Sequence, residues 1–176
     1  MVKRISIRSG AAGLLVTASA FGQFAATGAG TVSVAVAAEA AIHVATATTT
    51  LSNGAGTTFN TNYSGTTTLS FKPRSTKATG TASITVRNTE FAGNGPRVAR
   101  AELKFTCTAA SGTPCSGTKN ARTAAGVAVV SFATSASGAH SANAGDAATV
   151  DWQIVDKPRY ETGTYTSTAT FTISAT

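Results

Sequence analysis

The chain has 176 residues, and alanine, threonine, serine and glycine make up more than half of them. Charged residues amount to only 12%, too few for a coiled coil or for most enzymes of this size, while 42% hydrophobic residues argue against a disordered chain. The formal net charge is +7, but the basic residues are scattered and are not interleaved with aromatic ones, so we do not expect nucleic acid as a partner.

Residues 1–22 have the three parts of a secretory leader. A positively charged region comes first, with Lys3, Arg4 and Arg8. A short apolar stretch follows at residues 11–20, and small residues then allow cleavage after Ala20 or after Gly22. The apolar stretch is too short to cross about 30 Å of hydrocarbon. We therefore expect a signal peptide, a mature chain without a membrane span, and a secreted protein that is extracellular or on the cell surface.

Residues 23–45 predict an extended N-terminal strand. Apolar side chains recur there at alternate positions, namely Val32, Val34, Val36, Ile42 and Val44. A period of two is typical of a strand with one buried face.

Residues 46–176 predict one β-sandwich domain. Alternating apolar residues mark strands around 69–71, 84–86, 101–107, 127–132, 150–154 and 165–173. The connections are rich in glycine, asparagine, serine and proline, as expected for turns. In the last two strands we expect the core-facing side chains to be Val150, Trp152, Ile154, Tyr165, Phe171 and Ile173. The chain is predicted to be all-β, with a two-sheet sandwich of immunoglobulin-like or jelly-roll type.

The two cysteines, Cys107 and Cys115, predict one structural disulfide. An exported chain meets an oxidising environment, and two cysteines permit a single bridge. A zinc site would need further cysteine or histidine ligands nearby, and a catalytic thiol would need a histidine partner. Neither His43 nor His140 lies in such a motif. We expect no catalytic residue, no metal site and no cofactor.

The C-terminal segment, Gly163 to Ile173, combines a Gly-x-Tyr start with alternating threonine and apolar residues. It resembles the closing strand of secreted bacterial pilins of the Csu-type and spore-coat-U-like families. The resemblance covers the end of the chain and the general plan of leader, alternating N-terminal segment, disulfide and sandwich. Those pilins place their first cysteine near the start of the mature chain, whereas both cysteines lie mid-chain here.

The resemblance implies a non-enzymatic structural subunit of an extracellular fibre or pilus. Each subunit would donate its N-terminal strand to a neighbour, in a head-to-tail homopolymer. The candidate donor is residues 31–44, with the five apolar residues of the alternating segment as its inward-facing side chains. The implied partners are further copies of the chain, together with a periplasmic chaperone or an outer-membrane assembly factor.

Two alternatives remain open. The alternation in residues 31–44 would equally suit the first strand of the chain's own sandwich. The protein would also fit a second class, a monomeric secreted adhesin or carbohydrate-binding module. Three tyrosines would then be candidates for the sugar-binding surface, namely Tyr63, Tyr160 and Tyr165, although the alternation favours Tyr165 as a core residue.

Overall fold

The computed structural model describes residues 31–53, 61–92, 98–121 and 124–176. The chain divides after Val36 into two units, and every described strand belongs to the second unit, Ala37–Thr176. Of the first unit, residues 31–36 are described, and they lie outside any helix or strand. The predicted signal peptide, residues 1–22, lies outside the described residues.

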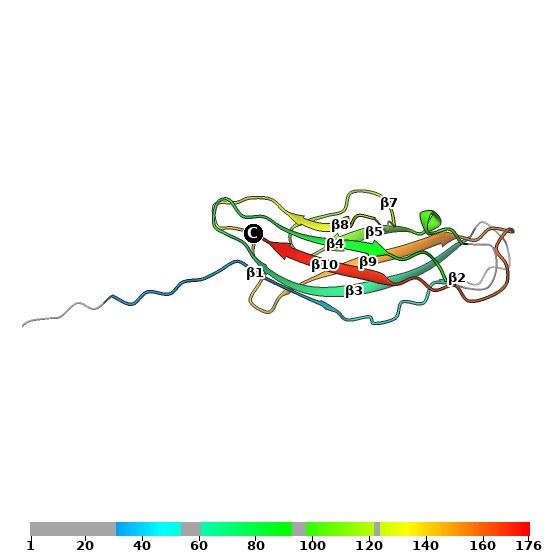
Figure 1. Ribbon diagram of the computed structural model, residues 1–176, viewed down its shortest axis with the longest axis horizontal. Coiled ribbons are helices and arrows are strands. Elements are labelled where there is room, and N and C mark those ends of the chain that lie inside the picture. Colours follow the sequence, from blue (N-terminus) through cyan, green and yellow to red (C-terminus); the bar gives the residue numbers. More distant parts are fainter. Residues whose placement is uncertain (1–30, 54–60, 93–97, 122–123) are drawn as a thin grey trace, which may run out of the picture. The chain divides into compact units, whose positions relative to one another are not determined.

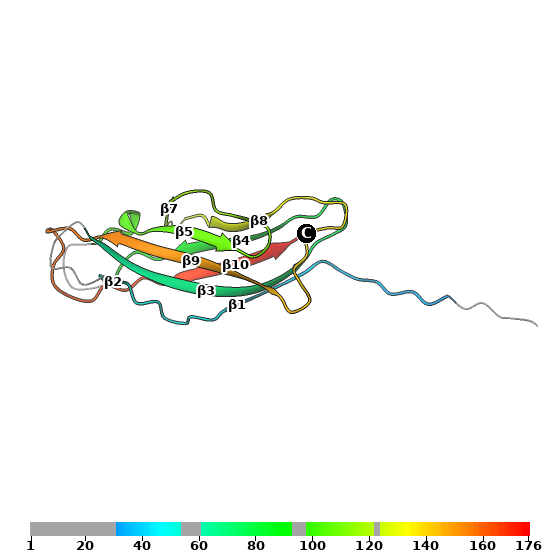
Figure 2. The same cartoon turned by 180° about the vertical axis from the view of Figure 1, so that it is seen from behind.

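The strands form two antiparallel sheets (Figures 1 and 2). In the six-stranded sheet the order is β1 (Glu39–Val44), β3 (Asn62–Arg74), β9 (Asp146–Val155), β5 (Lys104–Ala109) and β7 (Lys119–Asn120), with β2 (Ser52–Asn53) also paired to β3. In the four-stranded sheet the order is β10 (Ala169–Ala175), β4 (Ala82–Asn88), β8 (Val127–Phe132) and β6 (Thr113–Pro114). The one helical element among the described residues is a short 3-10 turn, Arg100–Glu102.

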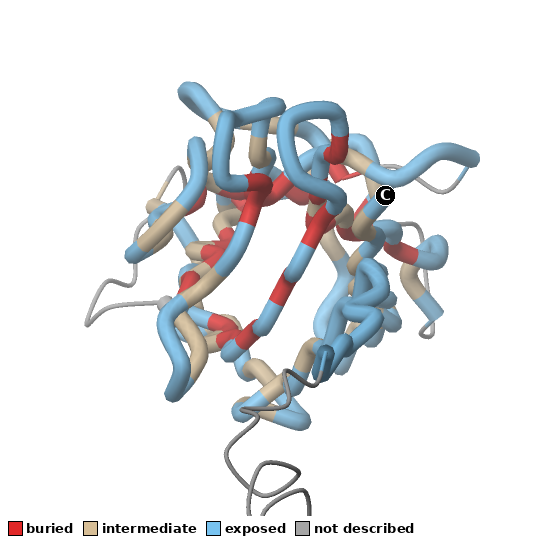
Figure 3. The backbone as a smooth tube through the Cα atoms, turned by 90° about the vertical axis from the view of Figure 1, so that its left-hand side faces the viewer, coloured by how far each residue is buried: buried red, intermediate tan, exposed pale blue. Residues whose placement is uncertain are grey.

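The core lies between the two sheets because apolar residues alternate along the strands. Figure 3 shows buried positions alternating with exposed ones along the chain trace. The fully buried side chains come from both sheets, among them Leu69, Phe71, Ile84, Val86, Phe105 and Val150. This arrangement confirms the predicted all-β fold with two sheets in a sandwich.

The disulfide connects the two sheets. Cys107 lies in β5 of the six-stranded sheet and is bonded to Cys115. Cys115 follows β6 directly, and its backbone N–H donates to the carbonyl oxygen of Val129 in β8 at 2.9 Å. The predicted bridge is therefore present, and it ties β5 to the four-stranded sheet.

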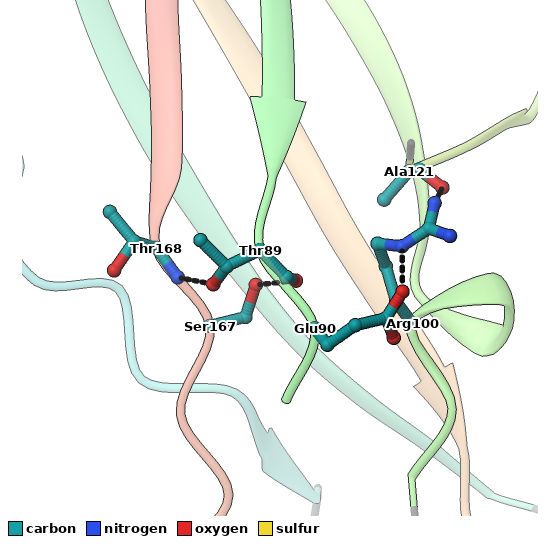
Figure 4. A network of polar contacts seen from close by, with 6 residues as sticks. All are labelled: Thr89, Glu90, Arg100, Ala121, Ser167 and Thr168. Atoms are coloured by element: carbon teal, nitrogen blue, oxygen red, sulfur yellow. Dashed lines mark hydrogen bonds and ion pairs between the residues drawn. The ribbon is translucent and has the colours of Figure 1, made fainter. Parts of the chain in front are cut away.

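The closing strand begins later than its sequence pattern predicts. Alternation starts at Tyr165, whereas β10 starts at Ala169. Figure 4 shows the reason: side chains replace the regular ladder just before the strand. The Ser167 hydroxyl donates to the carbonyl oxygen of Thr89, and the Thr168 N–H donates to the Thr89 hydroxyl, both at 2.9 Å. An isolated bridge between Ala92 and Thr166 follows, so the chain stays extended without being a regular strand.

Candidate assembly surface

Residues 31–36, here called the arm, carry a row of exposed apolar side chains. Val32, Val34 and Val36 are 98%, 85% and 62% exposed. Among the described residues, the only other large hydrophobic side chain classed as exposed is Val155, at 36%. Single exposed apolar residues are ordinary on protein surfaces, but three at alternate positions of one short segment make that segment a candidate interaction site.

The same face continues into β1, where it is covered. Ile42 and Val44 share the phase of the three valines, and they pack partly buried against the core. Their partners in β3 are the buried residues Phe71 and Leu69. The five side chains predicted for one donor strand therefore divide into an exposed group of three and a packed group of two. The sandwich begins within the segment predicted as an extension, because β1 precedes the expected boundary at residue 46.

Polar contacts at the start of β1 are exposed. Arg74 forms an ion pair with Glu39 and donates from Nε to the carbonyl oxygen of Ala37 at 3.0 Å. The two charged side chains are 49% and 74% exposed, so the pair contributes at most about 1 kcal/mol. The backbone ladder and the two packed side chains therefore hold β1 in place.

The six residues predicted for the closing core also fall into two groups. Val150, Trp152 and Ile154 of β9 are buried in the centre of the six-stranded sheet. The other three, Tyr165, Phe171 and Ile173, are only partly buried and pack against the core from its side. Phe171 and Ile173 are only partly covered because β10 is the edge of its sheet, a position that the sequence pattern does not reveal, and Tyr165 precedes that strand.

A cluster around Glu102 fastens the connection between β9 and β10. Lys157 Nζ lies 2.7 Å from the Glu102 carboxylate, which also pairs with Arg159 and accepts a hydrogen bond from the Tyr160 hydroxyl. Burial raises the pKa of Tyr160 above its ordinary value. Among the nearby charges Arg159 lowers this pKa and Asp156 raises it.

Two of the three candidate sugar-binding tyrosines, Tyr160 and Tyr165, form hydrogen bonds within the chain, while Tyr63 lies half-buried in β3. Tyr160 donates to Glu102, and the Tyr165 hydroxyl donates to the carbonyl oxygen of Glu161 at 2.8 Å. Both rings also pack against the core. These contacts make Tyr160 and Tyr165 structural groups and give no support to a shared ligand surface.

Arg100 forms a second polar cluster, also drawn in Figure 4. Its Nε donates to the Glu90 carboxylate at 2.7 Å, and a terminal nitrogen donates to the carbonyl oxygen of Ala121 at 3.0 Å. The cluster ties the 3-10 turn to the chain after β4 and to the end of β7. In the part of the chain that the structure describes, no three His, Cys, Asp or Glu side chains gather as they would around a metal ion. No described helix is long and apolar enough to cross a membrane.

Comparison with known proteins gives no match: no protein-family model, no curated protein and no solved structure is similar to this chain. The resemblance to pilins therefore stays a prediction based on the C-terminal residues, and function has to be argued from the arm and the sheet edges.

Proposed function

We propose that this protein is a secreted structural subunit of an extracellular fibre or pilus, without catalytic activity, that polymerises by donating its arm as a β-strand to a second copy. The observation that carries the proposal is the row of exposed valines, Val32, Val34 and Val36. The alternation matches what a strand needs if it is to place one face on a sandwich core.

Burial of the arm supplies the driving force. Covering a valine side chain completely stabilises a complex by about 1.5–3 kcal/mol, and strand pairing adds backbone hydrogen bonds. In a free monomer the extended arm has neither the buried valine side chains nor the hydrogen bonds of strand pairing. Because donor and acceptor are different surfaces, each copy can donate in one direction and accept in the other, which generates an open filament.

In this proposal the donor is the arm itself, while β1 remains in its own sheet. Both interpretations of the alternating segment then apply, each to one part of it. Ile42 and Val44 complete the subunit that carries them, and the three valines reach the neighbouring subunit. The leader would export the chain, and a periplasmic chaperone or outer-membrane assembly factor would cover the arm before assembly.

The test compares two variants with opposite faces of the arm changed. Val34→Asp places a charge on the apolar face, and Ala35→Asp places the same charge on the other face of the same exposed segment. We expect filaments from the wild type and from Ala35→Asp, seen by negative-stain electron microscopy of material sheared from expressing cells. We expect only monomers from Val34→Asp.

An unboiled denaturing gel of the same samples provides a second measurement. Strand-donated polymers dissociate slowly, so the wild type should give a ladder that collapses on boiling. Monomers in all three samples, in both the images and the gel, would contradict the proposal and favour a monomeric adhesin or carbohydrate-binding module.

A further inference from the structure

Both histidines of the chain lie on the same face of the six-stranded sheet, on either side of the last part of β3. His43 of β1 lies opposite Ser70 of β3, and His140, in the connection before β9, forms an isolated bridge with Arg74. Residues directly opposite each other in an antiparallel pair point to one face, and so do alternate residues of one strand. Ser70 and Arg74 share a face of β3, so the two histidines share it as well.

This face is the outer face of the sandwich, and it also carries lysine and arginine. Phe71 and Pro73 point to the core and are buried, whereas Lys72 and Arg74 alternate with them and are exposed. The Lys72 side chain lies over Gly145, where an added Cβ would come within 3.0 Å of its Cε. Both histidines are exposed, and so is Lys77 in the turn after β3. We call these five residues the histidine face, namely His43, Lys72, Arg74, Lys77 and His140.

The nearby carboxylates have partners within the chain. Glu39 of β1 pairs with Arg74, and the Asp146 carboxylate accepts from the Ser111 hydroxyl and from the Ala142 N–H. The remaining acidic residue of these strands, Asp151, lies further along the sheet, opposite Thr66. At neutral pH three cations therefore face two carboxylates that are already in use.

The balance of charge on this face changes in mild acid. Histidine is the side chain type that ordinarily takes up a proton between about pH 8 and pH 5. Protonation of both histidines would raise the cations from three to five, while carboxylates of ordinary acidity stay ionised at about pH 5.5. The face would then attract an anionic partner more strongly.

The neighbouring residues indicate what kind of anion fits. The other outward positions between the histidines are the small, exposed residues Ala41, Ser70 and Ala147. They include no aromatic ring on which a nucleic-acid base could stack and no large apolar side chain that could enter a lipid layer. The cations are spread over two strands and two connections instead of surrounding one pocket. A linear polymer with a carboxylate on each repeat matches this spread.

We infer that the histidine face binds an acidic polysaccharide, and that it does so more tightly in mild acid than at neutral pH. Charge complementarity over an exposed, flat surface provides the attraction, and the two histidines make it depend on pH. The inference goes beyond the proposed function, because it involves no residue of the arm and applies to a monomer as well as to a filament.

Binding of fluorescently labelled polygalacturonate, followed by anisotropy at about pH 7.5 and about pH 5.5, tests the inference. An exposed ion pair typically strengthens an interaction about two- to fivefold, so two added charges should lower the Kd about tenfold at the lower pH. His43→Gln combined with His140→Gln should abolish this difference. Lys72→Gln should weaken binding at both pH values. Lys104→Gln is the matched control, since Lys104 is exposed on the same sheet, opposite Gln153.

The fluorescence of the buried Trp152 checks that every variant folds. A wild-type Kd that is equal at the two pH values would overturn the inference, as would an equal loss of binding in Lys104→Gln and Lys72→Gln. Single-stranded DNA of similar length that binds as tightly as polygalacturonate would show attraction by net charge alone, which also overturns it. Equal binding of neutral dextran would show that charge plays no part.

Discussion

Trp152 depends on a single threonine for its buried polar group. Its indole N–H donates to the Thr67 hydroxyl at 2.8 Å, and both residues are buried. The same hydroxyl lies 2.6 Å from the hydroxyl of Thr49, which precedes β2. The ring of Phe105 packs against the indole with the ring centres 5.2 Å apart. Thr67 therefore links the centre of the core to the segment between β1 and β2.

Replacing Thr67 with valine should destabilise the protein, although the two side chains have nearly the same shape. The change leaves the buried indole N–H without a partner, which costs about 1–3 kcal/mol. Thr170→Val is the control, because it makes the same chemical change on the exposed face of β10. Urea unfolding followed by Trp152 fluorescence measures both. Equal free energies of unfolding for the two variants would show that the Thr67 hydroxyl does not matter.

At this scale the sequence predicts apolar core residues well and polar ones poorly. Val150, Trp152 and Ile154 alternate with polar residues, so their inward direction can be predicted, and all three are buried. Thr67 lies in the run Thr66–Thr68, where neighbouring positions have the same side chain. Such a run contains no hydrophobic contrast. The phase of Leu69 and Phe71 places Thr67 on the inward face, but the sequence does not show that its hydroxyl accepts the hydrogen bond of Trp152, 85 residues away.

Among the elements, the disulfide is the covalent link between the two sheets. Without it, only packing holds β5 against the segment after β6, which the hydrogen bond from Cys115 ties to β8 of its own sheet. We expect Cys107→Ala combined with Cys115→Ala to lower the free energy of unfolding by about 2–3 kcal/mol, since the short loop gains freedom in the unfolded chain.

Chemical denaturation with and without reductant tests this expectation. Reductant should lower the denaturation midpoint of the wild type and leave that of the double variant unchanged. A double variant as stable as the oxidised wild type would show that the bridge adds no stability.

Strand positions in the sheets are harder to predict than the strands themselves. Alternation predicts a strand near residues 165–173, and β10 lies there with a later start. Whether a strand is central or at an edge depends on pairing between distant residues, such as Phe171 with Val86. Periodicity along one strand carries no information on that pairing. The edge position of β10 could therefore not be found from sequence.

For the whole molecule, periodicity likewise fails to show which part of the predicted donor segment pairs within its own sheet. Alternation runs through residues 31–44 without a break in phase, but the sheet uses only its second part. Pairing of β1 begins at Glu39 because its partner Arg74 is the last residue of β3. The end of β3 therefore determines where the paired part of this segment begins, and β3 lies far from that part in sequence.

Assembly should tolerate high salt, because the proposed contact is uncharged while the chain as a whole is basic. Without the leader's Lys3, Arg4 and Arg8, lysine and arginine total 11 against 7 acidic residues, and the arm contains none of them. Copies of equal charge repel each other over about 10 Å at 0.1 M salt, and added salt shortens this range. Raising sodium chloride from about 0.05 M to about 0.5 M should therefore leave filaments intact and speed their formation, measured by light scattering and by the sedimented fraction. Charge-driven assembly responds in the opposite way, so filaments that dissolve in 0.5 M salt would contradict burial of the valine row as the driving force.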